Sequence, residues 1–161
     1  MSSIYLIGSL RNPKVPEVAA KLRADGHDVF DDWFAAGPEA DDYWKKYEQE
    51  RGHNYKEALA GYAADHVYKF DKHHIDRCDI AILMLPAGKS GHLELGYAIG
   101  KGKMGYILFD DGIPADRWDV MYKFADAVHF DLKTLAEELK RVHIGKVLHV
   151  AGTTLVINGN S

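Results

Sequence analysis

The sequence contains a single cysteine, Cys78, and only five prolines among its 161 residues. One cysteine cannot form an intramolecular disulfide, so an apolar core has to stabilise the fold. The low proline content excludes a collagen-like chain. A hydrophobic fraction of 47% beside 27% charged residues is typical of a folded chain rather than a disordered one. At this length we expect a single globular domain.

The chain also lacks an excess of positive charge and a long apolar run. Its net charge is −4, and residues 31–50 alone carry seven acidic and two basic side chains. We therefore expect no nucleic-acid polymer as a partner. The longest apolar run, residues 80–85, is far shorter than the roughly 18 residues of a membrane helix, and the first residues lack the pattern of a signal peptide. We expect a cytoplasmic protein with no membrane partner.

Short apolar segments alternate with amphipathic segments along the chain. Strand-like runs occur at 4–7, 27–30, 80–85, 104–109 and 127–130, and helical patterns occur at 15–26, 38–51, 55–77, 91–100, 118–125 and 132–142. This alternation predicts an α/β fold: a flavodoxin-like or Rossmann-like parallel sheet of about five strands with helices on both faces. We assign residues 1–145 to this domain, with a helical or lid insertion at 31–54, and residues 146–161 to a C-terminal β tail.

Several motif matches carry no function. The glycines at 100–105 match G-x-G-x-x-G, but they follow a helix and precede a strand, the reverse of a dinucleotide site. Residues 88–90 are the second half of a P-loop whose first glycine is replaced by Leu83. The histidines and aspartates at 65–76 match no metal-binding spacing, and Cys78 is interpreted as a small core residue. We expect neither a metal nor a cofactor.

Ligands of parallel α/β proteins usually bind at the carboxyl ends of the strands, here the loops at 8–12, 31–37, 86–90 and 110–112. Glu94 lies one turn into the helix that follows the strand at 80–85, and we expect Ser90 to be the N-cap of that helix. The segment around Glu94 has almost no other charge, and Asp71 precedes the same strand. Two carboxylates in different surroundings can cleave a glycosidic bond.

Three segments carry a family resemblance: IYLIGSLRNP at 4–13, FDKHHIDRCD at 70–79 and SGHLELGYAIGKGK at 90–103. Together they resemble the nucleoside 2-deoxyribosyltransferase family, including the related 2'-deoxynucleoside 5'-monophosphate N-hydrolases. The resemblance covers about residues 4–130. It implies a soluble enzyme that cleaves or transfers at the N-glycosidic bond of a (deoxy)nucleoside or its 5'-monophosphate. It also implies a homo-oligomer with a shared active site.

The resemblance assigns roles to individual residues. It implies that Glu94 is the nucleophile, that Asp71 transfers the proton, and that Tyr5 orients Glu94. It implies that Asp119 is lent to the site of a neighbouring subunit. The sugar, base and phosphate contacts then come from residues of the predicted loops: Gly8, Ser9, Arg11, Trp33, Gly88, Ser90 and Gly91.

Other readings stay open. Gly88 stands where many relatives have an aspartate, which favours a catalytically weak or inactive module that binds or senses a nucleotide. The aromatic residues of the acidic insertion (Trp33, Tyr43, Trp44 and Tyr47) fit a lid over the base, an oligomer contact or core packing. Arg11 fits either a phosphate contact or a surface pair with an acid such as Glu17. A flavodoxin-like scaffold protein is the third possible function.

Overall fold

The computed structural model describes residues 1–150, with side chains as far as Val142. Five strands form one parallel sheet in the order β2-β1-β3-β4-β5. They are β1 (Ser3–Ile7), β2 (Asp28–Phe30), β3 (Ile80–Leu85), β4 (Met104–Phe109) and β5 (Ala127–His129). Every neighbouring pair is parallel, so the predicted α/β class with a five-stranded parallel sheet is confirmed.

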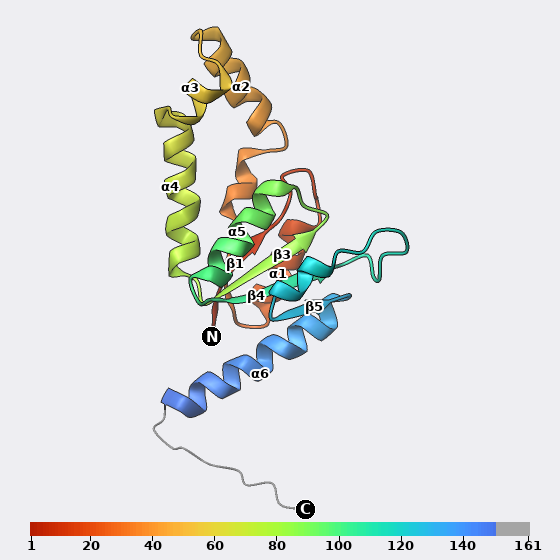
Figure 1. Ribbon diagram of the computed structural model, residues 1–161. Coiled ribbons are helices and arrows are strands. Elements are labelled where there is room, and N and C mark those ends of the chain that lie inside the picture. Colours follow the sequence, from red (N-terminus) through yellow and green to blue (C-terminus); the bar gives the residue numbers. More distant parts are fainter. Residues whose placement is uncertain (151–161) are drawn as a thin grey trace, which may run out of the picture.

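Helices cover both faces of this sheet (Figure 1). The α-helices are α1 (Val15–Ala24), α2 (Ala40–Glu50), α3 (Tyr55–Leu59), α4 (Tyr62–Arg77), α5 (Lys89–Gly100) and α6 (Leu132–Val150), and short 3-10 helices are η1 (Asp32–Ala36) and η2 (Val120–Phe124). Helices α1 and α6 pack on one face, and α4 and α5 pack on the other. Among the described residues, no helix is long and apolar enough to cross a membrane.

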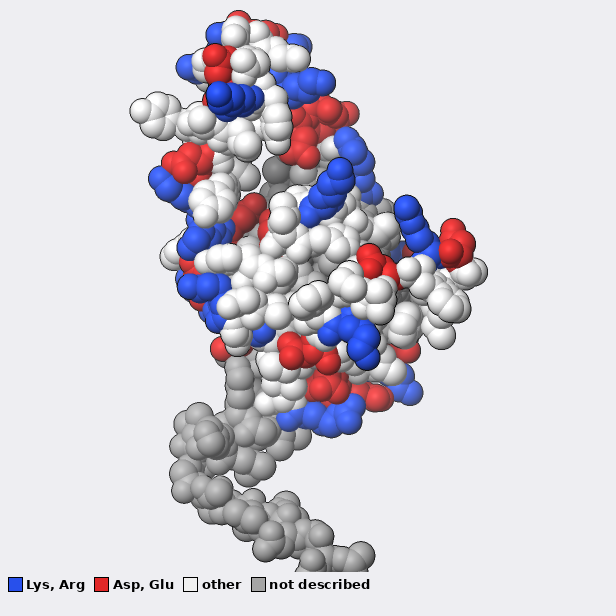
Figure 2. Space-filling model, in the orientation of Figure 1, with Lys and Arg blue, Asp and Glu red and all other residues white. Residues whose placement is uncertain are grey.

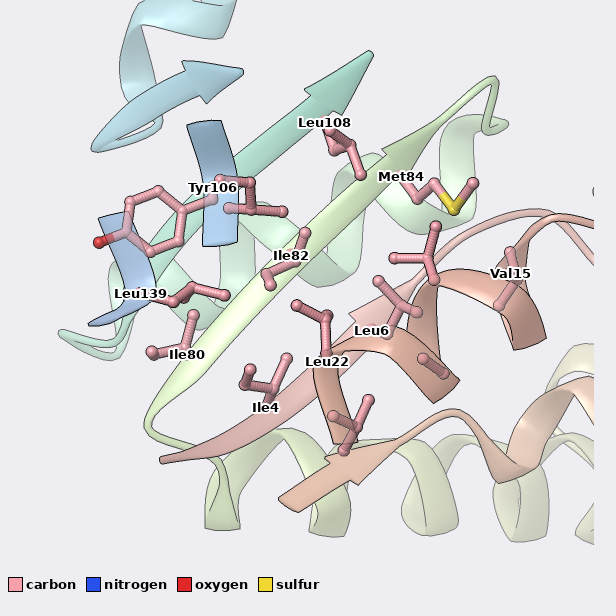
Figure 3. Packing of buried hydrophobic residues seen from close by; sticks show 14 residues of the cluster. Ile4, Leu6, Val15, Leu22, Ile80, Ile82, Met84, Tyr106, Leu108 and Leu139 are labelled. Carbon is pink, nitrogen blue, oxygen red and sulfur yellow. The ribbon is translucent and has the colours of Figure 1, made fainter. Parts of the chain in front are cut away.

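The core follows from the two-residue period of the strands. In β1, Ile4 and Leu6 face α1 and α6, whereas Tyr5 and Ile7 face α4 and α5. All six residues of β3 are buried, because the central strand has a helix layer on each side. Figure 3 shows the core on the face that α1 and α6 cover. There, Leu22 and Leu139 of these helices pack against strand side chains: Ile4, Leu6, Ile80, Ile82, Met84 and Leu108.

The strand order places a crevice over the middle of the sheet. From β1 the chain moves to one side to form β2, and it then returns to the other side of β1 to form β3. The carboxyl ends of β1 and β3 therefore diverge at a topological switch point, where α/β proteins bind their ligands. Gly8 and Pro86 are the first residues beyond these two strand ends.

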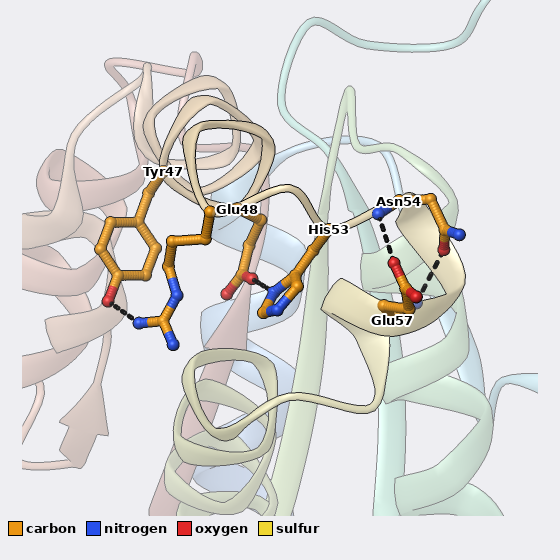
Figure 4. Close-up of polar contacts among 6 residues, drawn as sticks. Tyr47, Glu48, His53, Asn54 and Glu57 are labelled. Carbon is orange, nitrogen blue, oxygen red and sulfur yellow. Dashed lines mark hydrogen bonds and ion pairs between the residues drawn. The ribbon is translucent and has the colours of Figure 1, made fainter.

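A helical arm, formed by α2, α3 and the first part of α4, projects away from the sheet (Figure 1). Short polar contacts stabilise the turn between α2 and α3, as Figure 4 shows. His53 Nδ1 lies 2.5 Å from Glu48 Oε2, and the Glu48 carboxylate is buried. Asn54 and Glu57 form a capping box that begins α3. At the base of the arm, Arg11 pairs with Asp42 at 3.5 Å.

Two element boundaries differ from the sequence predictions. The helix expected over 55–77 is interrupted, because Gly61 has an extended backbone that ends α3 and caps α4. The last helix continues to Val150, so the first residues of the expected β tail at 146–161 are helical. β-Branched residues lower helix propensity only slightly, which lets this helix continue through them. The rest of that tail, residues 151–161, lies outside the described residues.

Candidate functional site

Two carboxyl groups meet beside a buried tyrosine on the face of the sheet that α4 and α5 cover. Tyr5 comes from β1, Asp71 from α4 and Glu94 from α5. The Tyr5 hydroxyl forms a hydrogen bond with the Asp71 side chain, and it lies within electrostatic reach of Glu94. Asp71 and Glu94 also repel one another electrostatically. The structure therefore brings together the three residues that the sequence analysis places at the centre of the site.

These surroundings change the acidity of both carboxyl groups. Burial raises the pKa of Glu94 to about 8, and the neighbouring Asp71 carboxylate adds to this increase. Burial also raises the pKa of Asp71, while the hydrogen bond from Tyr5 opposes it. The pKa of Tyr5 is raised by burial and by both carboxylates, so its hydroxyl keeps its proton. With a pKa of about 8, the Glu94 carboxyl group is mostly protonated at neutral pH.

One oxygen of this pair has no protein partner. Asp71 Oδ1 is buried, and no described residue forms a hydrogen bond with it. A buried carboxylate oxygen without a partner costs free energy, because it has lost its hydration without a replacement. Such groups are uncommon in folded proteins and are typical of positions that receive a ligand.

Helix α5 lies unusually close to the sheet, and this position places Glu94. A Cβ atom on Gly91 would lie 3.0 Å from Leu83 Cδ1 and 3.1 Å from Ile7 Cγ2. On β4, a Cβ atom on Gly105 would lie 2.4 Å from Ile99 Cγ1. Gly105 therefore leaves the space that Ile99 of α5 occupies, and Gly91 lets the first turn of α5 lie in close contact with the strands. Gly91, which the sequence analysis assigns to the substrate, is buried against the strands.

A cavity of about 390 Å³ lies at the carboxyl ends of β1 and β3. Its lining includes three of the predicted binding residues, Ser9, Arg11 and Gly88. Sequence reasoning missed its other polar residues, Asn12, Lys14 and Asp111. Lys14 follows closely after the predicted ligand loop at 8–12, so its basic side chain was the available signal. The cavity thus combines two cationic side chains with the residue that precedes α5.

The cations of this cavity are paired with acids from other elements. Lys14 Nζ lies 2.5 Å from Asp111 and 3.5 Å from Asp110, both in the loop after β4. Arg11 pairs with Asp42 at the start of the arm and not with Glu17, the acid suggested by the sequence. The Arg11 and Asp42 side chains are each 71% exposed, so this ion pair is weak and its guanidinium can exchange partners.

The remaining predicted residues lie elsewhere. Gly8 packs under Trp33, whose Nε1 donates a hydrogen bond of 2.8 Å to the Leu6 carbonyl, so Trp33 packs against the core and not as a free lid. Ser90 is exposed within the first turn of α5, and the N-cap is Gly88, which corrects the predicted cap. Asp119 caps η2 through a 2.9 Å hydrogen bond from the Met121 amide.

Asp119 also lines a second, mainly apolar cavity of about 250 Å³ beside η2, together with Phe109, Trp118, Tyr122 and Phe130.

No grouping of three His, Cys, Asp or Glu side chains suited to a metal ion occurs in the described part of the chain. Figure 2 shows that the surface over α5 carries few charged side chains, whereas the arm is densely charged.

Neither a protein-family model nor a curated protein matches this sequence. A solved structure is similar: the CMP N-glycosidase BcmB of Clostridium botulinum, with a TM-score of 0.51. The similarity covers 86% of this chain and 98% of that chain, with 14% sequence identity. At this identity the likeness establishes the fold, and the fold of this chain resembles that of an N-glycosidase.

Proposed function

We propose that this protein cleaves the N-glycosidic bond of a nucleoside 5'-monophosphate or its nucleoside, with Glu94 as the nucleophile. The observation that carries the proposal is the pair of carboxyl groups, Glu94 and Asp71, that meet beside the buried Tyr5. This pair provides a nucleophile and an acid in one place, as glycosidic cleavage through a covalent intermediate requires. The fold shared with a CMP N-glycosidase supports the same class of reaction.

In the first step, ionised Glu94 attacks the anomeric carbon of the sugar. The bond from that carbon to the base breaks, and its electron pair leaves with the base. Asp71 donates a proton to the departing base, which makes the base a better leaving group. The reactive form therefore has a proton on Asp71 and the negative charge on Glu94, whereas Glu94 in the free protein is mostly protonated at neutral pH.

In the second step, water attacks the anomeric carbon of the glycosyl ester, and the carboxylate of Glu94 leaves. Asp71, now ionised, accepts a proton from that water. A second base in place of water would give transfer instead of hydrolysis. Tyr5 keeps its proton throughout, because its pKa is raised, and its hydrogen bond fixes the orientation of Asp71.

The cavity at the ends of β1 and β3 supports a phosphorylated substrate. Ser9, Arg11 and Lys14 can donate charge-assisted hydrogen bonds to a phosphate, and Gly88 precedes the positive end of the α5 dipole. Glu94 follows Gly88 by six residues, about 9 Å along the helix axis. Gly88 and Glu94 thus place the anion and the nucleophile along the same helix, while Asp71 approaches Glu94 from α4.

The raised pKa of Glu94 also favours the second candidate function, a module that binds a nucleotide without cleaving it. A carboxyl group with a pKa of about 8 is mostly protonated at neutral pH, and a protonated carboxyl group is a poor nucleophile. The two functions share the same ligand and differ only in turnover. Base release therefore separates them.

We also propose that a second copy of this chain covers the uncharged surface near α5. Large apolar side chains are exposed there and on the neighbouring η2 segment: Leu93, Trp118, Val120, Met121 and Phe124. Of the aromatic residues of the acidic insertion, Tyr43 and Tyr47 are exposed, whereas Trp33 and Trp44 are half-buried. An exposed apolar surface of this kind is typical of a subunit interface.

Chromatography of the free base tests the proposed function. Wild-type protein is incubated with cytidine 5'-monophosphate, its 2'-deoxy form and the two parent nucleosides, and Glu94→Gln and Asp71→Asn are assayed in parallel. We expect base release by the wild type, with Glu94→Gln slower by at least about a thousandfold. Glu17→Gln, on the exposed surface of α1, is the matched control and should be unchanged. Tight binding without base release would support the binding module instead.

A further inference from the structure

His92, in the first turn of α5, has both ring nitrogens engaged. Nδ1 lies 2.7 Å from the carbonyl oxygen of Gly88, and Nε2 lies 3.0 Å from the hydroxyl of Tyr122. A carbonyl only accepts hydrogen bonds, so Nδ1 carries the proton of the neutral ring and Nε2 accepts from the tyrosine hydroxyl. The two rings also stack, with centroids 5.7 Å apart and planes 22° apart. Two hydrogen bonds and one ring stack therefore fix the orientation of the imidazole.

Tyr122 is itself held in place, although it belongs to a different element. Its ring contacts Phe109 at the end of β4, with centroids 5.9 Å apart, and it packs against the buried layer under α5. Burial, with a smaller effect from Asp119, raises the pKa of Tyr122, so its hydroxyl remains a donor. The tyrosine thus links the sheet to the first turn of α5 through His92.

Gly88 is the residue whose position this link controls. It lines the cavity together with Pro86 and Ala87, opposite the loop that carries Ser9 and Arg11. A Cβ atom on Gly88 would meet no atom within 4 Å, so side-chain packing does not hold this residue in place. The hydrogen bond from His92 to its carbonyl is therefore the side-chain restraint on Gly88 that the structure shows.

We propose that His92, oriented by Tyr122, is a positioning residue that fixes residues 86–88 and thereby sets the affinity of the cavity for the anionic end of the substrate. The identity of that substrate rests on the proposed function, whereas the effect on the loop does not. His92 has no catalytic role in this account, because both of its nitrogens are occupied by protein groups. It acts on the substrate only through Gly88.

Three variants test this inference. Tyr122→Phe keeps the ring and removes the donor to His92, and His92→Ala removes the whole link. Tyr106→Phe is the matched control: Tyr106 lies on the opposite face of the sheet, and its buried hydroxyl has no hydrogen-bond partner among the described residues. Each variant is assayed with cytidine 5'-monophosphate and with cytidine. Hydrogen exchange of the amides at 87–90 is measured in the same proteins without ligand.

We expect Tyr122→Phe to raise KM for the monophosphate about fivefold, as the loss of one hydrogen bond implies, with kcat within twofold. His92→Ala should raise it further. KM for cytidine should stay the same, and amide exchange at 87–90 should become faster in both variants but not in Tyr106→Phe. A purely structural role would lower stability without changing the ratio of the two KM values.

Two outcomes would overturn the inference. One is unchanged exchange at 87–90 and an unchanged KM ratio in both Tyr122→Phe and His92→Ala. The other is a large loss of kcat at constant KM, which would make His92 part of the chemistry. Faster exchange in a protein that cleaves no nucleotide would contradict the proposed function and still support the positioning of the loop by His92.

Discussion

The rings of Phe30 and His74 stack with centroids 3.8 Å apart and planes 9° apart. Phe30 is the last residue of β2, beside β1, and it also stacks on Tyr5 with centroids 5.2 Å apart, whereas His74 lies one turn after Asp71 on α4. Phe70, just before Asp71, also contacts Phe30 at 5.7 Å. A single ring therefore contacts Tyr5 and both helix positions that flank Asp71. This contact fixes the proposed acid relative to the sheet.

Replacing the ring of Phe30 should separate these residues. We expect Phe30→Leu to lower kcat for base release about tenfold, because a small displacement of a positioned acid is costly. The free energy of unfolding should fall by about 1 kcal/mol. His74→Phe keeps a stacked ring and should retain activity within threefold, whereas His74→Ala should not. Tyr62→Leu, at an exposed aromatic position at the start of α4, is the control. Full activity in His74→Ala would show that the stack has no role.

The raised pKa of Glu94 predicts a specific pH dependence of stability. The folded protein keeps this proton up to about pH 8, whereas the unfolded chain releases it near the ordinary value of 4.5. The folded state binds more protons in that window, so stability is greatest below it and falls as the pH rises through it. Between pH 5 and pH 8.5, denaturant unfolding should show wild type losing roughly 2–4 kcal/mol more than Glu94→Gln. Equal losses would indicate that Glu94 is not buried in this way.

The raised pKa of Glu94 also predicts how activity changes with pH. For cytidine 5'-monophosphate, kcat/KM should decline above pH of about 8, where both carboxyl groups are ionised and no acid remains for the base. A substrate that needs no protonation, such as 4-nitrophenyl riboside 5'-phosphate, should instead react faster as the pH rises through this value. Asp71→Asn removes the repulsion that raises the pKa of Glu94, so its profile for the nitrophenyl substrate should shift to lower pH. The same profile for both substrates would argue against Asp71 as the acid.

Arg11 should distinguish a nucleotide from its nucleoside. Two charge-assisted hydrogen bonds at about 1.5–3 kcal/mol each would favour the monophosphate by roughly two to four powers of ten in kcat/KM. Arg11→Ala should lose most of this preference, with little effect on the nucleoside. Asp42→Asn, which frees Arg11 from its ion pair, should leave the preference intact or raise it. A wild-type preference for the nucleoside would place the phosphate site elsewhere and favour a transferase.

The proposed second copy can be tested through Leu93, which is 76% exposed on α5. Leu93→Glu puts a charge into the uncharged surface and should convert the oligomer to an 18.0 kDa monomer in sedimentation experiments. Lys101→Glu, an exposed change near the other end of the helix, is the control. A wild-type protein that is monomeric at concentrations where it is fully active would contradict an active site shared between subunits.

The sequence pattern predicted the sheet well, because strands that are buried on both faces are continuous apolar runs. The runs at 4–7, 80–85 and 104–109 all lie within the observed strands. Helix ends were harder to place. Ser90 is a good N-cap by residue type, but α5 begins two residues earlier, after Gly88, and its first turn packs Gly91 closely against the strands. Local preference was overridden by tertiary packing.

For the site, the sequence supplied Glu94 and Asp71 through a charge-poor helix and a family resemblance. It could not supply contacts that depend on the three-dimensional arrangement. His92 and Tyr122 are 30 residues apart, and Phe30 and His74 are 44 residues apart, with no motif that links either pair. The predicted roles of Trp33 and Gly91 likewise depended on which way each residue faces. Both pack against the body of the protein.

Trapping a glycosyl group on Glu94 tests the central claim most directly. The probe is a 2'-deoxy-2'-fluoro nucleoside 5'-monophosphate. Its fluorine substituent destabilises the charged transition states and so slows breakdown of the glycosyl ester on Glu94. After incubation and acid quenching, peptide mass spectrometry should find the fluorinated sugar phosphate on Glu94, together with one equivalent of released base. Glu94→Gln should show neither. Release of base in excess of the protein, with an unmodified Glu94 and full activity in Glu94→Gln, would contradict the account.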